Sequence, residues 1–163
     1  VWLNSETKLK YPVSFINGED RKVQLVYGQD KRGRELQRTF FRGRHGAEIS
    51  GVAFEVIAPD GYSGNITMMV GVDAAGMVVG LEILSHAETP GLGDKITHAE
   101  FKEQFKGKAL EGVDWRVKKD GGAFDQITGA TISPRAVVKA VHKGLQFYRD
   151  HRQELFSSER EDQ

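Results

Sequence analysis

The chain has 163 residues, a length that suits one domain of the usual size. Its 23 basic and 23 acidic residues give a formal charge of zero, which argues against a general nucleic-acid-binding protein because such proteins carry a basic excess. The chain has no cysteine, so disulfides, iron–sulfur clusters and a cysteine nucleophile are excluded, and its five histidines show no metal-ligand spacing.

The N-terminal part predicts one short strand followed by a basic segment. Residues 23–27 form an apolar and aromatic run that is typical of a strand. Residues 28–46 then carry six Lys and Arg against two Asp and Glu. We interpret 28–46 as a solvated excursion, and contact with an anionic partner or a membrane surface is the alternative.

Three further runs predict strands. Apolar residues alternate with others along 52–58, and again along 65–72 and 77–84. The last two runs flank the turn 73–76, which ends in glycine, so together they predict a β-hairpin.

A short helix and another strand are predicted next. Thr97 and Glu100 fit a capping box, with Thr97 as the N-cap. Phe101 and Phe105 follow at a spacing of four, which predicts that both rings face the core. Residues 115–119 predict a short strand.

The C-terminal part predicts a second helix, with Ser133 as N-cap and Pro134 at the first helical position. Strands followed by segregated helices favour an α+β fold with a curved antiparallel sheet, in one domain over residues 1–150. The polar tail, residues 151–163, is expected to fray. The apolar face of the second helix comprises Ala136, Val137, Ala140, Val141, Gly144 and Leu145.

The loop 86–95 is one of two segments whose residues are costly to explain by a purely structural role. It follows a predicted strand and contains Pro90 and Gly91, with a second glycine at Gly93. Glycine lets the backbone approach a ligand closely, and Leu92 between the two glycines would form an exposed apolar tip suited to a flat ring. The alternative is a plain turn between strand and helix.

The second segment, residues 125–133, places small hydroxyl side chains around a glycine directly before the predicted second helix. The unpaired amides and the dipole at a helix start favour an anion, most often phosphate. The alternative is that Thr128, Thr131 and Ser133 only cap the helix. The residues alone leave these two interpretations even.

Both segments resemble one known family. The pattern Asp-x-x-Ser/Thr-Gly-Ala-Thr is the flavinylation motif of FMN-binding domains, and the chain matches it at residues 125–131. Residues 88–93 are similar to the flavin-contacting loop of that family. Further matches at 58–64 and 117–122 point to the G subunit of the Rnf ion-translocating electron-transport complex, which is related to the C subunit of the sodium-pumping NADH:quinone oxidoreductase.

The resemblance implies a covalent FMN on Thr131, because in that family the last threonine of the motif carries FMN through a phosphoester bond. Asp125 would serve the modification by holding Mg²⁺ or orienting the threonine hydroxyl, and the alternative is an Asx-turn cap. Lys118 or Lys119 would stabilise the reduced flavin or the phosphate. Only one of the two would point inward, because side chains alternate along a strand, and the alternative for either is a solvated lysine. Tyr62 would flank the ring or pack in a hairpin. The other residues expected at the cofactor are Glu88, Thr89, Gly91, Leu92, Gly93, Thr128, Gly129, Ala130 and Ser133.

The resemblance also implies a function and a location. We expect an electron-carrier subunit that works inside a membrane complex linking ferredoxin and NAD, with no substrate of its own. A membrane helix ahead of Val1 would anchor it to the inner membrane with the domain on the periplasmic side, and a flavin transferase using FAD and Mg²⁺ would attach the FMN. The alternatives are a structural module of the complex without flavin and a stand-alone flavin reductase.

Overall fold

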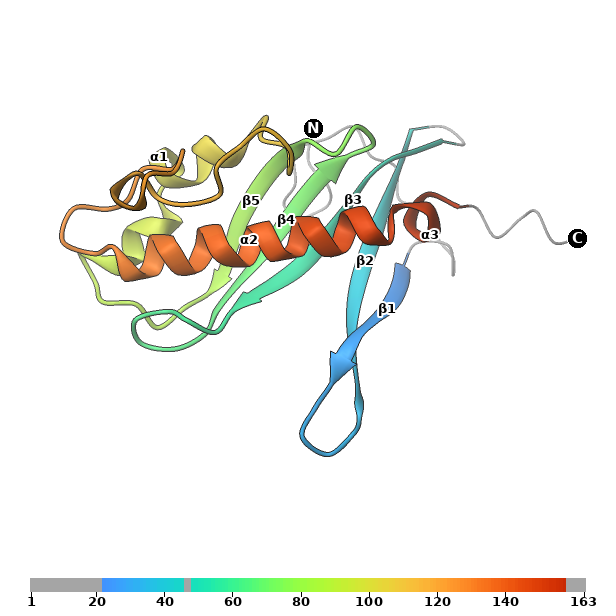
Figure 1. Ribbon diagram of the computed structural model, residues 1–163, viewed down its shortest axis with the longest axis horizontal. Coiled ribbons are helices and arrows are strands. Elements are labelled where there is room, and N and C mark those ends of the chain that lie inside the picture. Colours follow the sequence, from blue (N-terminus) through green and yellow to red (C-terminus); the bar gives the residue numbers. More distant parts are fainter. Residues whose placement is uncertain (1–21, 46–47, 158–163) are drawn as a thin grey trace, which may run out of the picture.

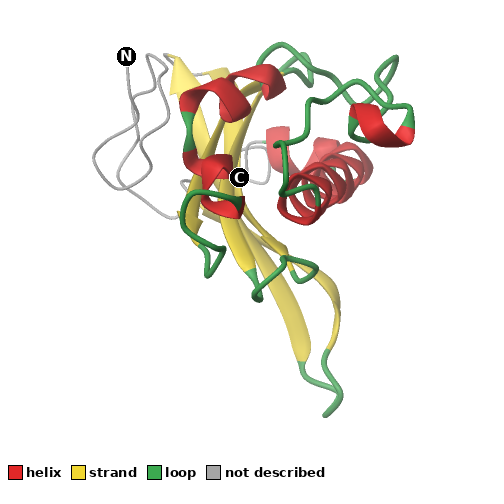
Figure 2. Ribbon diagram, turned by 90° about the vertical axis from the view of Figure 1, so that its left-hand side faces the viewer, coloured by secondary structure: helices red, strands yellow, loops and turns green. Residues whose placement is uncertain are grey.

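The fold is built on one antiparallel sheet whose strands follow each other in chain order. The computed structural model describes residues 22–45 and 48–157, and the sheet has the order β1-β2-β3-β4-β5. The predicted α+β fold with an antiparallel sheet is confirmed, and Figure 2 shows the sheet edge-on with its twist. The strands are β1 (Lys22–Gln29), β2 (Glu35–His45), β3 (Glu48–Ala58), β4 (Ile66–Asp73) and β5 (Val78–Ser85).

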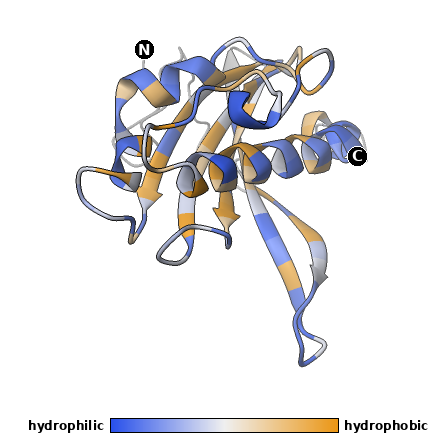
Figure 3. Ribbon diagram, turned by 60° about the vertical axis from the view of Figure 1, so that its left-hand side comes forward, coloured by the Kyte–Doolittle hydropathy of each residue, from blue (hydrophilic) through white to orange (hydrophobic). Residues whose placement is uncertain are grey.

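Most of the basic segment 28–46 belongs to a hairpin of β1 and β2, so this part of the predicted solvated loop or excursion consists of paired strands and not of a loop. The turn is held by the Asp30 carboxylate, which accepts hydrogen bonds from the amides of Arg32 and Arg34 at 2.8 and 3.0 Å. The hairpin projects away from the body of the molecule (Figure 1), and its tip is hydrophilic (Figure 3). The many charges had concealed the period-two pattern that places Phe40 in the core.

The long helix α2 (Ile132–Asp150) covers one face of the sheet, as Figure 2 shows. Its predicted apolar face is buried, which confirms the pattern. Gly144 allows the closest approach to the sheet, because a Cβ at this position would lie 3.0 Å from the Phe54 ring and from a methyl of Val56. The opposite face of α2 is hydrophilic and turns away from the sheet (Figure 3).

The short helix predicted after Thr97 is broken into three pieces, namely η2 (Gly93–Thr97), α1 (Ala99–Lys102) and η3 (Glu103–Phe105). Thr97 is not an N-cap, because its hydroxyl donates to the Asp94 carbonyl at 2.8 Å and His98 precedes α1. The burial of both phenylalanines is confirmed, with Phe101 5% exposed and Phe105 fully buried. Core packing of these rings, rather than a capping box, therefore holds the segment.

Residues 115–119 do not form the predicted strand. The chain makes one isolated bridge between Val117 and Phe124, and then the 3-10 helix η4 (Lys118–Asp120). Trp115 is buried and its ring lies 4.9 Å from that of Phe124, so aromatic packing fixes the segment where strand pairing had been expected.

The start of the C-terminal tail is folded, where we had expected fraying from residue 151. Arg152–Phe156 form α3, and Leu155 is fully buried. The Arg42 guanidinium donates to the carbonyls of Leu155 and Glu154, each at 2.9 Å. The rest of the predicted tail, residues 158–163, lies outside the described residues. Among the helices of the described part of the chain, none has the length and apolar character needed to cross a membrane.

Candidate functional site

One hollow of about 290 Å³ brings together the two segments that the sequence singled out. One wall is the loop after β5, the second is the start of α2 with the turn before it, and the third comes from the loop between β3 and β4. Three separate parts of the chain therefore meet at one end of α2. The lining residues are Tyr62, Glu88, Thr89, Leu92, Gly93, Gly129, Ala130, Thr131, Ile132 and Ser133.

A buried carboxylate joins these three walls. Glu88 is 4% exposed and accepts hydrogen bonds from the amides of Tyr62 and Ser63, at 3.0 and 3.1 Å, and from the Ser133 hydroxyl. Burial alone would raise the pKa of this carboxyl, but the hydrogen bonds from Ser133, Ser63 and Tyr62 outweigh it and hold the pKa below its ordinary value. Glu88 is thus ionised at neutral pH and fixes the shape of the hollow.

Ser133 does not cap α2, which corrects the prediction. The helix already begins at Ile132, so Ser133 lies inside its first turn and turns its hydroxyl to Glu88. Leaving the buried Glu88 carboxylate without a hydrogen-bond donor costs more free energy than leaving one amide of the helix start uncapped. The Ser133 hydroxyl therefore bonds to Glu88 and not to the helix start.

The loop from Thr89 to Gly93 is shaped by its two glycines. Gly91 has a φ of +75°, a left-handed conformation that favours glycine, and the Leu92 amide donates to the Thr89 carbonyl at 3.1 Å. Gly93 packs against the hydrogen-bonded side chains of Glu88 and Ser133, because a Cβ at this position would lie 2.5 Å from the Ser133 hydroxyl oxygen. The second glycine of the predicted loop is therefore required by packing within the site.

The rim of the hollow is apolar and open to solvent. Tyr62, Leu92 and Ile132 are 67%, 43% and 46% exposed, although each has a large apolar side chain. Exposed apolar side chains grouped around a hollow are typical of a ligand site. Sequence reasoning missed Ile132, because its spacing of four from Ala136 is also typical of a buried helix face.

Thr131 occupies the N-cap position of α2, but its hydroxyl makes no capping hydrogen bond to the helix amides. The first intrahelical hydrogen bond of α2 runs from the Arg135 amide to the Thr131 carbonyl at 3.1 Å, so the amides of Ile132 and Ser133 have no intrahelical acceptor and the helix start can receive an anion. The Thr131 hydroxyl therefore lies beside both an anion-binding helix start and the apolar rim of the hollow. These are the features needed to hold an aromatic ring system that carries a phosphate.

The predicted motif is divided between two hollows. Gly129, with a φ of +77°, turns the chain between them. Asp125 and Thr128 line a second hollow of about 240 Å³, together with residues of η2, α1 and η3. The Asp125 carboxylate pairs with the Lys118 ammonium at 2.6 Å, and among the described residues no hydrogen bond joins it to the Thr131 hydroxyl.

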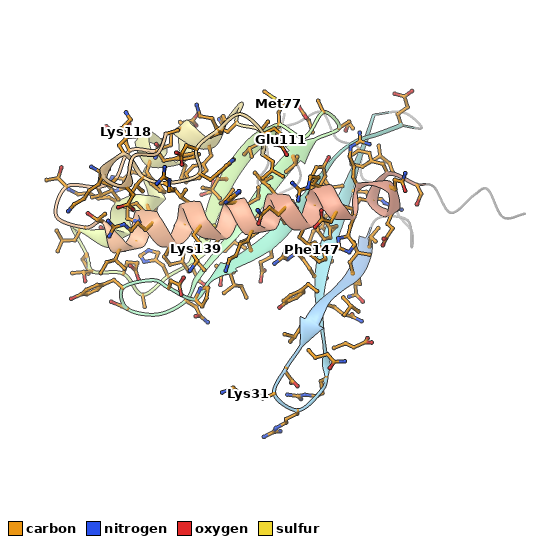
Figure 4. All side chains as sticks on the ribbon, viewed as in Figure 1. Lys31, Met77, Glu111, Lys118, Lys139 and Phe147 are labelled. Carbon is orange, nitrogen blue, oxygen red and sulfur yellow. The ribbon has the colours of Figure 1, made fainter. Side chains whose placement is uncertain are left out.

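The two lysines that the sequence proposed as cofactor contacts lie outside the main hollow. Lys118 and Lys119 are both exposed and belong to η4, so the alternation of a strand does not apply to them. Lys118 lies at the end of the molecule far from Phe147 (Figure 4). The Lys119 amide donates to the Gln126 side chain at 3.1 Å, which ties η4 to the motif segment.

The comparison with known protein families decides the family. The model of the FMN-binding domain matches residues 61–146, more than half of the chain. The chain belongs to the FMN-binding domain family. The matched residues include all three walls of the hollow, and the resemblance predicted from the motif is confirmed.

Curated relatives of this FMN-binding domain are named as the G subunit of an ion-translocating oxidoreductase complex. The protein from Aliivibrio fischeri is 50% identical over 136 residues, which cover 80% of this chain and 65% of the relative. Those from Shewanella oneidensis and Pseudomonas aeruginosa are 51% identical over 111 residues and 45% identical over 132. The match to the Shewanella oneidensis protein covers 65% of this chain and 52% of that relative. The match to the Pseudomonas aeruginosa protein covers 78% of this chain and 62% of that relative. The chain thus spans less than two thirds of the length of these relatives.

Solved structures share the fold of this FMN-binding domain. NqrC of Shewanella oneidensis superposes with a TM-score of 0.60 at 22% identity, over 96% of this chain and 72% of that one. The C subunit of the Na(+)-translocating NADH-quinone reductase of Parabacteroides distasonis gives 0.58 at 23% identity, over 75% and 64%. The predicted relation to that C subunit is confirmed at the level of the fold.

Proposed function

We propose that this domain carries electrons in an ion-translocating oxidoreductase complex, through an FMN attached to Thr131 by a phosphoester bond. The observation that carries the proposal is the hollow at the start of α2, where Thr131, the open helix amides and an apolar rim meet. Its support is the family membership together with the names of relatives that are about half identical. When bound, FMN accepts and releases electrons singly or in pairs.

Each lining group has a task in this proposal. The helix start would hold the phosphate, with the amides of Ile132 and Ser133 as donors. Tyr62, Leu92 and Ile132 would contact the apolar ring system, and Glu88 keeps the walls in place. The hollow is open, so covalent attachment to Thr131 prevents the loss of a cofactor that the protein does not enclose.

The attachment step is assigned to a flavin transferase with FAD and Mg²⁺. The Thr131 oxygen attacks the flavin-side phosphorus of FAD, the pyrophosphate bond breaks, AMP leaves, and the hydroxyl proton is released. Asp125 faces the second hollow and pairs with Lys118, so we place it with the transferase and not with the bound ring. The anchor ahead of Val1, the periplasmic location and the contacts with other subunits belong to the same proposal.

Coexpression with a flavin transferase, in an exported form, tests the assignment. We expect the intact mass to rise by FMN less one water, and Thr131→Ala to abolish the gain. That variant should keep its melting temperature, because the hydroxyl makes no capping bond. Thr128→Ser is the matched control and should still be modified, whereas Asp125→Ala should not.

Peptide mapping by mass spectrometry identifies the modified residue. Flavin on Thr128 or Ser133, or a mass gain that persists in Thr131→Ala, would contradict the attachment site. A domain that gains no mass under any of these conditions would be the structural module without flavin. Turnover of a soluble substrate by the flavinylated domain alone would instead support the stand-alone reductase.

A further inference from the structure

The strands β2 and β3 separate at one side of the sheet. They pair from Phe40 opposite Phe54 to His45 opposite Glu48, and the pairing stops there. Within the described part of the chain, residues 35–39 of β2 pair with β1 alone, and residues 55–58 of β3 pair with β4 alone. Two strand edges therefore face each other across a gap, which we call the notch, at the base of the projecting hairpin (Figure 1).

The notch encloses about 320 Å³ and is partly apolar. Tyr27 and Ile57 are 46% and 48% exposed, which is unusual for two large side chains on one small surface. The Arg38 guanidinium lies 5.0 Å from the Tyr27 ring centre and 4.9 Å from that of Phe147, so a cation is held at its base. The lining residues are Tyr27, Gln37, Arg38, Thr39, Phe41, Glu55 and Ile57.

The hairpin beside the notch concentrates the positive charge of a neutral chain. Residues 22–45 contain seven Lys and Arg and two Asp and Glu, whereas the whole chain has equal numbers. Arg34 pairs with Asp30 at 2.7 Å, but Lys31 and Arg32 form no ion pair with any residue in 22–45 or 48–157. Figure 4 places Lys31 at the hairpin tip and Phe147 near the base. The positive electrostatic potential of this hairpin attracts an anionic binding partner to the notch.

We propose that the notch binds an extended, acidic segment of another protein, which adds as a strand between β2 and β3. Open strand edges offer directional backbone donors and acceptors, and a polypeptide strand satisfies both. A flat bilayer surface does not reach groups that are recessed between two strands, so a protein segment fits better than a lipid surface. The carboxylates of the segment pair with Arg38 and with the cations of the hairpin, and its apolar side chains cover Tyr27 and Ile57.

Photocrosslinking in native membranes tests this proposal with the full-length protein. A benzoylphenylalanine placed at Gln37 probes the β2 edge, and one at Ile57 probes the β3 edge. We expect both to crosslink to the same peptide of another protein, with at least two acidic residues in it. Met77, exposed at the distant turn between β4 and β5, is the matched control and should not reach that peptide.

A charge variant tests the complementarity. Arg38→Gln should lower the yield at Ile57 by about fivefold, close to 1 kcal/mol, with only a small decrease in melting temperature from the lost contacts with the Tyr27 and Phe147 rings. The crosslink should persist in flavin-free Thr131→Ala, so the result does not depend on the proposed function. Crosslinks to lipid, to a second copy of this chain or to its own residues, or no crosslink at all, would overturn the proposal. So would different peptides at the two edges, or a yield unaffected by Arg38→Gln.

Discussion

Replacing Glu88 by alanine removes one acceptor on which three donors converge. The donors are the amides of Tyr62 and Ser63 and the hydroxyl of Ser133, and the carboxylate is 4% exposed. A hydrogen bond to a charged group contributes about 1.5–3 kcal/mol, and part of this is recovered when the loop amides turn to water. We therefore expect Glu88→Ala to lower the free energy of unfolding by about 3–5 kcal/mol, and Glu88→Gln, which keeps an acceptor, by about 1–2 kcal/mol.

The same carboxylate predicts a pH dependence. Its pKa in the folded protein lies below the value of about 4.3 for a free glutamate, so folding favours the ionised form. The contribution of Glu88 is complete above the unfolded-state pKa and is lost as the pH falls through the lower, folded-state pKa. The difference in stability between the native chain and Glu88→Gln should therefore shrink in acid.

Urea unfolding, followed by circular dichroism and by the fluorescence of the buried Trp115, measures both effects. Glu111→Ala is the matched control, because the Glu111 side chain is 82% exposed and its loss should cost little. A Glu88→Ala variant that loses less than about 1 kcal/mol would refute the idea that this carboxylate holds the three walls together. A difference that stays constant between neutral and acidic pH would refute its ionised state.

Three more substitutions test the core and the hollow. Phe101→Ala should lower the free energy of unfolding by about 3–5 kcal/mol, because its ring is buried and its centre lies 5.5 Å from that of Phe105. A loss below about 1 kcal/mol in a denaturant melt would contradict this packing. Gly93→Ala should cost about 1–3 kcal/mol, since its methyl would crowd the Ser133 oxygen, and an unchanged melting temperature would show that the loop yields. Leu92→Ala in flavinylated protein should change the flavin absorption spectrum or midpoint potential but not the mass, and wild-type values of both would place the ring elsewhere.

Local patterns predicted the elements whose neighbours are close in sequence. The hairpin of β4 and β5 and the buried face of α2 both follow from apolar periodicity, which depends only on the strand or helix itself. The meeting of Leu92 with Gly129 and Thr131 came from the family motif, because no spacing along the chain shows that two loops about 40 residues apart share a hollow.

The wrong predictions concern residues whose partners are distant. Ser133 has the sequence context of an N-cap, yet its partner is Glu88, 45 positions earlier. Thr97 and Glu100 match a capping box, but the burial of aromatic rings bends that segment into short turns. In each case the cost of leaving a buried group unpaired or a ring exposed exceeded the local preference.

The length of α2 separates the two ends of this molecule. The 16 steps from Thr131, beside the hollow, to Phe147, which meets Tyr27 and Arg38, rise about 24 Å. Under the proposals made above, a partner bound in the notch would hold the Phe147 end of α2, and a small rotation about that end would move the hollow through a wider arc.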